Sequence, residues 1–133
     1  MPLSRITVLV VEDDPDAREL MQAVLEQRGA TVISAESVPR ALELLETAAP
    51  DVIVSDIAMP EEDGVALVRR LRALPLGRCS EIPAIAVSAY VAASDRARAL
   101  DAGFDRYLHK PVDFDELVAA IRAVSRREKK ASA

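Results

Sequence analysis

Five short runs rich in Val and Ile alternate along this chain with longer segments of helical period, and this alternation constrains the fold more than any other feature. Apolar runs of this kind are typical of parallel strands that are buried on both faces of a sheet. The predicted strands cover residues 6–11, 31–34, 52–55, 84–87 and, more weakly, 106–108. The pattern therefore predicts a three-layer α/β fold, (βα) repeated five times, with five helices on the two faces of a five-stranded parallel sheet.

Residues that commonly cap helices bound most of the helical segments. They are Asp14, Gly29, Ser37, Ser94, Gly103 and Asp113. Asp14 precedes a proline, which favours the first turn of a helix, and we expect the first helix to begin there. Ser94 and Gly103 are expected to bound the fourth helix. Asp113 with Glu116 resembles a capping box and predicts the start of the fifth.

The chain is long enough for one compact domain and too short for two. It has 133 residues, and half of them are hydrophobic. The last residues, 126–133, are polar and include two arginines and two lysines. We therefore expect a single folded domain over residues 1–125 and a polar basic tail over 126–133.

The charge balance and the single cysteine exclude several classes of protein. Lys and Arg number 17 against 22 Asp and Glu, so the net charge is −5 and the basic excess typical of nucleic-acid binding is missing. Cys79 has no second cysteine with which to form an internal disulfide. No run approaches the roughly 18 apolar residues of a membrane span, and no signal peptide is evident. We expect a cytoplasmic protein that binds neither nucleic acid nor membrane directly.

Chemically reactive side chains lie just after four of the apolar runs. They are Glu12, Asp13 and Asp14 after the first run, Asp56 after the third, Ser88 after the fourth and Lys110 after the fifth. In a doubly wound sheet, ligands bind outside the carboxyl ends of the strands. Each residue taken alone could be a turn former, a cap or a solvated strand end. Together they predict a site in which carboxylates, a hydroxyl and an ammonium group converge.

Carboxylates that lie close together repel one another unless a cation offsets their charge. A hard divalent ion is the natural occupant, and Mg²⁺ is typically held by one or two carboxylates together with phosphate oxygens and waters. The sequence therefore predicts an Mg²⁺ site, which could also take Mn²⁺, at the strand ends.

Four segments of the chain resemble the receiver domains of two-component response regulators. They are VLVVEDD at 8–14, VIVSDIAMPEEDG at 52–64, IAVSAY at 85–90 and AGFDRYLHKP at 102–111. The resemblance covers nearly the whole chain and implies a flavodoxin-like fold with strand order 2-1-3-4-5. It also implies a phosphorelay signalling switch rather than a metabolic enzyme, because such a domain catalyses only its own phosphorylation and dephosphorylation.

The resemblance implies a role for each residue at the predicted metal site. Asp56 would accept the phosphoryl group from a histidine kinase or a histidine phosphotransfer protein. Asp13 and Asp56 would bind the metal directly, Glu12 would bind it through water, and the backbone carbonyl of Ala58 would supply a further ligand. Asp14 lies just outside this set and is interpreted as the helix cap.

The resemblance also implies how phosphorylation is transmitted. Ser88 would hydrogen-bond the phosphoryl group and Lys110 would pair with its charge. Tyr107 would turn inward together with Ser88, and the changed surface would contact a downstream protein or output domain. His109 is interpreted as a local packing residue, and Cys79 is given no role.

Two other functions remain open on the residues alone. Asp14 and Asp16 form the Asp-x-Asp pattern of a haloacid-dehalogenase-like phosphatase, although Ala17 and Arg18 depart from that pattern. A flavodoxin-like binding module without catalysis is the second alternative. Within the receiver interpretation, the chain is either a stand-alone regulator or the receiver of a larger protein such as a hybrid histidine kinase.

Overall fold

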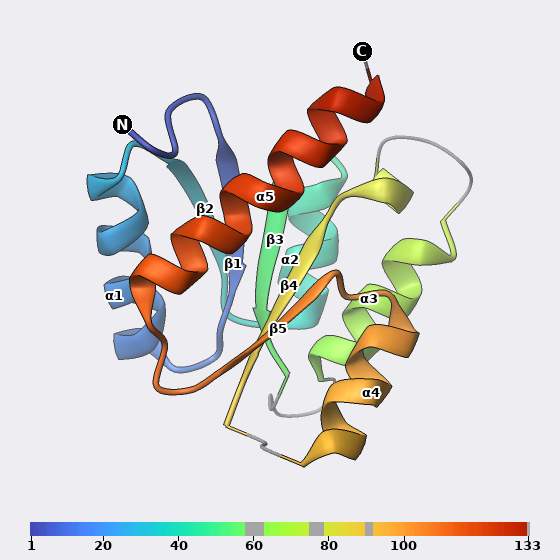
Figure 1. Ribbon diagram of the computed structural model, residues 1–133. Coiled ribbons are helices and arrows are strands. Elements are labelled where there is room, and N and C mark those ends of the chain that lie inside the picture. The colour runs from blue at the N-terminus through green and yellow to red at the C-terminus, as the bar shows by residue number, and fades with distance from the viewer. Residues whose placement is uncertain (58–62, 75–78, 90–91, 133) are drawn as a thin grey trace.

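The computed structural model describes residues 1–57, 63–74, 79–89 and 92–132, and it describes side chains as far as residue 125, except that of Cys79 (Figure 1). All the strand pairs are parallel, and the sheet has the order β2-β1-β3-β4-β5. The strands are β1 (Thr7–Val11), β2 (Thr31–Ala35), β3 (Val52–Asp56), β4 (Ala84–Ser88) and β5 (Arg106–His109). The predicted sheet and strand order are confirmed, with strand ends that differ from the expected ones by a single residue.

The helices alternate with the strands in the predicted way. They are α1 (Pro15–Gln27), α2 (Val38–Leu45), α3 (Gly64–Arg72), α4 (Ala93–Ala102) and α5 (Phe114–Ser132), with a short 3₁₀ turn, η1 (Cys79–Glu81), before β4. Figure 1 shows α5 crossing one face of the sheet, with α1 beside it, while α3 and α4 lie together at the other side. None of the described helices is both long and apolar enough to span a bilayer.

Each face of the sheet has its own hydrophobic core, which explains why the strands are continuous apolar runs. Val8, Val10 and Val54 pack with Leu25 of α1 and Leu117 of α5. The alternate strand residues point the other way, since successive side chains in a strand face opposite sides. They pack against the opposite layer: Leu9, Val11, Ile53, Ala84 and Ala86 lie in one cluster with Ala41, Leu67, Leu71 and Ala99.

The helix starts follow the predicted caps except at α4. Asp14 accepts a hydrogen bond from the Asp16 amide at 3.2 Å, and Asp113 accepts bonds from the amides of Asp115 and Glu116. The expectation that Ser94 caps the fourth helix was wrong, because α4 begins one residue earlier, at Ala93, and its cap, Ala92, makes no side-chain hydrogen bond. A cap contributes only about 1 kcal/mol, so alanines that favour helix extend it upstream of the serine.

The end of α4 is held by Arg72, a contact that could not be predicted from the sequence. Arg72, the last residue of α3, donates hydrogen bonds to the carbonyl oxygens of Gly103 at 2.9 Å, Ile82 at 2.6 Å and Ser80 at 3.2 Å. Its guanidinium also pairs with Asp105 at 3.3 Å. Arg72 therefore joins α3 to the end of α4 and to the segments that lead into β4 and β5.

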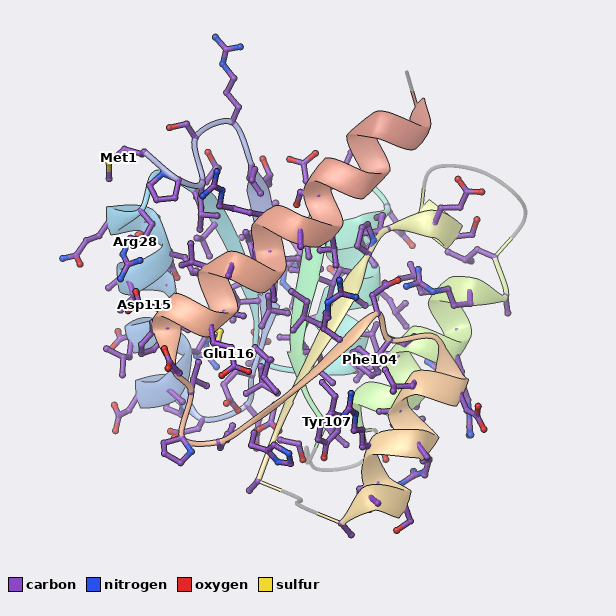
Figure 2. All side chains as sticks on the ribbon, in the orientation of Figure 1. Met1, Arg28, Phe104, Tyr107, Asp115 and Glu116 are labelled. Atoms are coloured by element: carbon purple, nitrogen blue, oxygen red, sulfur yellow. The ribbon has the colours of Figure 1, made fainter. Side chains whose placement is uncertain are left out.

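The predicted basic tail continues the last helix, because the backbone of α5 extends as far as Ser132. The base of this helix is tied to α1 by a salt bridge of 3.1 Å between Asp115 and Arg28, which lie side by side in Figure 2. The division between a domain at 1–125 and a tail at 126–133 stays a prediction.

Candidate functional site

Three carboxyl groups meet at the carboxyl ends of β1 and β3. Glu12 and Asp13 follow β1 directly, and Asp56 is the last residue of β3. One oxygen from each of the three lies within 4.8 Å of the others. Glu12 is 2% exposed and Asp56 is 7% exposed, whereas Asp13 is half-buried. Asp13 is therefore the most solvent-accessible of the three acids.

Lys110 completes the cluster from the end of β5. Its Nζ lies 2.9 Å from Oε1 of Glu12 and 2.9 Å from Oδ2 of Asp56. The Lys110 amide donates to the carbonyl of Ser88 at 2.8 Å, which continues the pairing of β4 and β5 by one residue. A cis peptide bond links Lys110 to Pro111. Glu12, Asp13, Asp56 and Lys110 therefore lie together, as predicted, at the carboxyl ends of the strands.

The electrostatics of the cluster favour a bound cation. Burial raises the pKa of Glu12 to about 7, against the hydrogen bond from Lys110, and the adjacent Asp56 carboxylate adds to the rise. Burial alone would lower the pKa of Lys110, but the hydrogen bonds to Asp56 and Glu12 outweigh it and raise that pKa. One lysine thus balances part of the charge of three buried or half-buried carboxyl groups, and a further cation would offset the repulsion that remains.

The donor set fits a hard divalent ion. All three acidic residues offer oxygen atoms, which Mg²⁺ and Mn²⁺ prefer, and Asp13 is partly exposed to solvent. Asp13 and Asp56 could bind such an ion directly. Both oxygens of Glu12 already accept hydrogen bonds, one from Lys110 and one from the Asp14 amide. Ala58, whose carbonyl was expected to be a further ligand, lies outside the described residues.

The backbone around Asp56 is held by two residues that sequence reasoning did not single out for this role. The Ser55 hydroxyl donates to the carbonyl oxygen of Asp56 at 2.9 Å. A Cβ on Gly64, the first residue of α3, would lie 2.5 Å from that same oxygen, so only glycine permits α3 to approach so closely. The Gly64 amide donates to the Ile57 carbonyl at 3.0 Å. The start of α3 thus rests directly on the end of β3.

The two predicted switch residues lie on neighbouring strands. Ser88 ends β4 and is fully buried, and Tyr107 of β5 is 8% exposed. Figure 2 shows Tyr107 near Phe104, on the side of the sheet that α4 covers, and both rings belong to the core cluster of that face. The His109 ring contacts Tyr107, with ring centroids 5.4 Å apart, which agrees with a local packing residue.

The acids of the phosphatase alternative lie elsewhere. Asp14 and Asp16 are both exposed, and Asp14 caps α1. The acidic cluster found in the described part of the chain consists of Glu12, Asp13 and Asp56 and includes neither of them. The interpretation of Asp14 as a helix cap is confirmed.

A family model described as the response regulator receiver domain matches residues 8–122, which is most of the chain. An uncharacterized 14.6 kDa protein of Leptolyngbya boryana is 48% identical over 120 residues, with 90% of each chain covered. The KDP operon transcriptional regulatory protein KdpE of Escherichia coli is 40% identical over 120 residues, which are 90% of this chain and 51% of KdpE. The chain therefore spans about half the length of that relative.

Solved structures agree with the sequence relatives. The receiver domain of the Francisella response regulator 1452 has a TM-score of 0.85 at 31% identity and covers 93% of this chain and 99% of its own. The receiver domain of the Pseudomonas aeruginosa sensor histidine kinase PA1611 has a TM-score of 0.81 at 29% identity, with 90% and 97% covered, and its structure has a magnesium ion coordinated in the active site cleft.

These matches cover most of the chain and favour neither a phosphatase nor a binding module. They agree with the parallel sheet of order β2-β1-β3-β4-β5 and with the acidic cluster and lysine at its edge. The chain belongs to the family of receiver domains of two-component response regulators, which act as signalling switches phosphorylated on an aspartate.

Proposed function

We propose that Asp56 is the aspartate that is phosphorylated, in a reaction that depends on Mg²⁺. The observation that carries this proposal is the position of its carboxylate at the end of β3. Its Oδ2 lies 2.9 Å from Nζ of Lys110, and one of its oxygens lies within 4.8 Å of oxygens of Glu12 and Asp13. Glu12 has the same neighbours, but its second oxygen accepts a hydrogen bond from the Asp14 amide, and burial raises its pKa and so disfavours the carboxylate that would attack phosphorus.

The chemistry needs positioning and charge stabilisation more than covalent assistance. A carboxylate oxygen of Asp56 attacks phosphorus, a P–O bond forms, and the bond from phosphorus to the donor, a histidine nitrogen, breaks. Lys110 stays beside Asp56 and stabilises the negative charge on the transferred group. When bound by Asp13 and Asp56, Mg²⁺ would neutralise charge on the phosphoryl oxygens, and Mn²⁺ has the same preference for oxygen. The magnesium ion of the PA1611 receiver structure supports this assignment.

Phosphorylation would act on the protein through Ser88 and Tyr107. The acyl phosphate carries about −1.5 to −2 of charge where the carboxylate carried one, so it attracts hydrogen-bond donors such as the Ser88 hydroxyl. Ser88 and Tyr107 lie on the adjacent strands β4 and β5, and their side chains face the side of the sheet that α4 covers. A movement of Ser88 would therefore change the packing around Tyr107. The outcome would be a changed surface over α4, β5 and α5.

The partners follow from the family. A histidine kinase or a histidine phosphotransfer protein would donate the phosphoryl group, and a downstream protein or output domain would receive the signal. This chain would make no nucleic-acid contact of its own. Both settings, a stand-alone regulator and the receiver of a larger protein such as a hybrid kinase, are compatible with these partners.

The metal requirement can be tested by Asp13→Asn. Acetyl phosphate and Mg²⁺ should add one phosphoryl group to the unsubstituted protein, labile to hydroxylamine as an acyl phosphate is. Asp13→Asn should lower the rate about 100-fold, since loss of a metal ligand removes about 3 kcal/mol of charge stabilisation. Intact-mass spectrometry over a Mg²⁺ titration measures the number of phosphoryl groups added and the rate of their addition.

The control is Asp14→Asn, which changes the adjacent acid in the same way and keeps a side chain that caps α1. It should be phosphorylated at the unsubstituted rate. Equal rates for Asp13→Asn and Asp14→Asn, or normal phosphorylation in EDTA, would contradict the metal site.

Ser88→Ala should separate phosphorylation from the response. Asp56, Lys110 and the acidic cluster are untouched, so the variant should still take up a phosphoryl group. The variant lacks the hydroxyl that would move toward the phosphoryl group. Phosphorylation can shift the equilibrium between two conformations only by the difference in its interactions with them, and Ser88→Ala removes one such interaction. Amide chemical shifts of α4 and α5 should therefore change less on phosphorylation than in the unsubstituted protein, while identical changes in both would argue against the switch.

A further inference from the structure

The rings of Tyr107 and His109 form a contact on the face of β5 that α4 covers. The two residues are two apart in a strand, so their side chains lie on the same face. Their ring centroids are 5.4 Å apart and their planes meet at 80°, an edge-to-face arrangement. Tyr107 is buried and His109 is exposed. The imidazole thus lies at the outer side of the tyrosine ring.

The same histidine lies beside the other proposed switch residue. In the pairing of β4 with β5, His109 is the direct partner of Ser88, and Tyr107 is the direct partner of Ala86. Directly opposed residues in neighbouring strands lie close together on one face of the sheet. His109 is therefore the strand neighbour of Ser88 and the ring partner of Tyr107.

His109 is separate from the phosphorylation chemistry. The next residue, Lys110, contacts Glu12 and Asp56, and successive side chains in an extended segment point to opposite faces. The acidic cluster in the described part of the chain does not include His109. Its ring is placed to act on the response to phosphorylation rather than on phosphoryl transfer.

We propose that His109 is a positioning residue that holds the Tyr107 ring in its buried orientation and so favours the switched state of the domain. This inference rests on the proposed roles of Asp56, Ser88 and Tyr107. Edge-to-face rings attract because the positive edge of one meets the negative face of the other. The attraction of such a pair corresponds to about a 2- to 10-fold change in a two-state equilibrium.

The ring contact is tested first, without phosphorylation. His109 is the single histidine of the chain, so the imidazole protons give an unambiguous NMR signal. Spectra of the unsubstituted protein and of the variant Tyr107→Leu are recorded at the same pH and temperature. We expect the ring current of Tyr107 to displace the chemical shift of this signal, and Tyr107→Leu should remove the displacement. An unchanged signal in Tyr107→Leu would overturn the contact.

The effect on the switch is tested with acetyl phosphate and Mg²⁺. His109→Ala should still be phosphorylated, but the ratio of switched to unswitched protein, measured from amide shifts of β4 and α4, should fall about 2- to 10-fold. His109→Phe keeps an aromatic ring and should restore most of the ratio. Arg106→Ala, an exposed substitution on the opposite face of β5, should leave it unchanged.

The outcomes separate this inference from the proposed function. An unchanged ratio in His109→Ala, or a ratio in His109→Phe as low as in His109→Ala, would overturn the role of the ring while Asp56 remained the phosphorylation site. Failure of the unsubstituted protein to take up any phosphoryl group would overturn the proposed function, and the inference with it.

Discussion

Asp56→Asn should abolish phosphorylation, with the amount of phosphoprotein falling at least about 10³-fold. The carboxamide lacks the anionic oxygen that attacks phosphorus. Glu12, which also contacts Lys110, has its second oxygen bonded to the Asp14 amide and cannot replace Asp56. The variant should fold, because Lys110 keeps its contact with Glu12 at 2.9 Å and the charge repulsion in the cluster decreases. Intact-mass spectrometry after incubation with acetyl phosphate and Mg²⁺ measures the loss.

Asp14→Asn provides the comparison for this experiment. If the chain used the Asp-x-Asp pattern of a phosphatase, Asp14→Asn would lose the reaction and Asp56→Asn would keep it. The receiver mechanism predicts the reverse, because Asp14 only caps α1 and asparagine caps a helix equally well.

Arg72→Met should lower the free energy of unfolding by about 3 kcal/mol. The guanidinium donates to carbonyl oxygens of Gly103, Ser80 and Ile82, and methionine keeps the apolar stem but no donor. Buried carbonyls left without a donor cost about 1 to 3 kcal/mol, and Asp105 would lose its ion pair as well. For a chain of this length the midpoint of thermal unfolding should fall by about 10 °C.

Urea and thermal unfolding followed by circular dichroism measure this loss. Arg69→Met is the matched control, since Arg69 lies exposed on the same helix and such substitutions change stability by less than about 0.5 kcal/mol. A loss below about 1 kcal/mol in Arg72→Met would mean that water replaces the guanidinium at these carbonyls, and that Arg72 does not fix the end of α4.

The residues of the site could be predicted because apolar runs indicate the strands and reactive side chains after those runs indicate the site. Strands buried on both faces are apolar throughout, so the first reactive side chain after such a run is easy to recognise, as Asp56 is after residues 52–55. The parallel sheet then requires these strand ends to meet at one edge. The sequence could not predict that Lys110 bridges Asp56 and Glu12, because side-chain geometry depends on packing across three strands.

Other features depended on contacts that no local pattern encodes. Arg72 bonds to backbone carbonyls, which every residue carries, so nothing in the residues around positions 80 and 103 identifies its partners. The pairing of His109 with Ser88 needs the register of β4 and β5. The predicted cap of α4 at Ser94 was wrong, because the preference of serine for the cap position is weak compared with the preference of the neighbouring alanines for helix.

The phosphoryl group should reside on Asp56, and chemical identification of the modified residue tests this directly. Borohydride reduces an aspartyl phosphate to homoserine, which marks the site permanently. Trypsin then separates the candidates, since Asp13, Asp14 and Asp16 fall in the peptide of residues 6–18 and Asp56 in that of residues 41–69. Mass spectrometry should find homoserine at position 56 alone, and only when Mg²⁺ was present. Homoserine at position 13, 14 or 16, with an unmodified residue 56, would contradict the account.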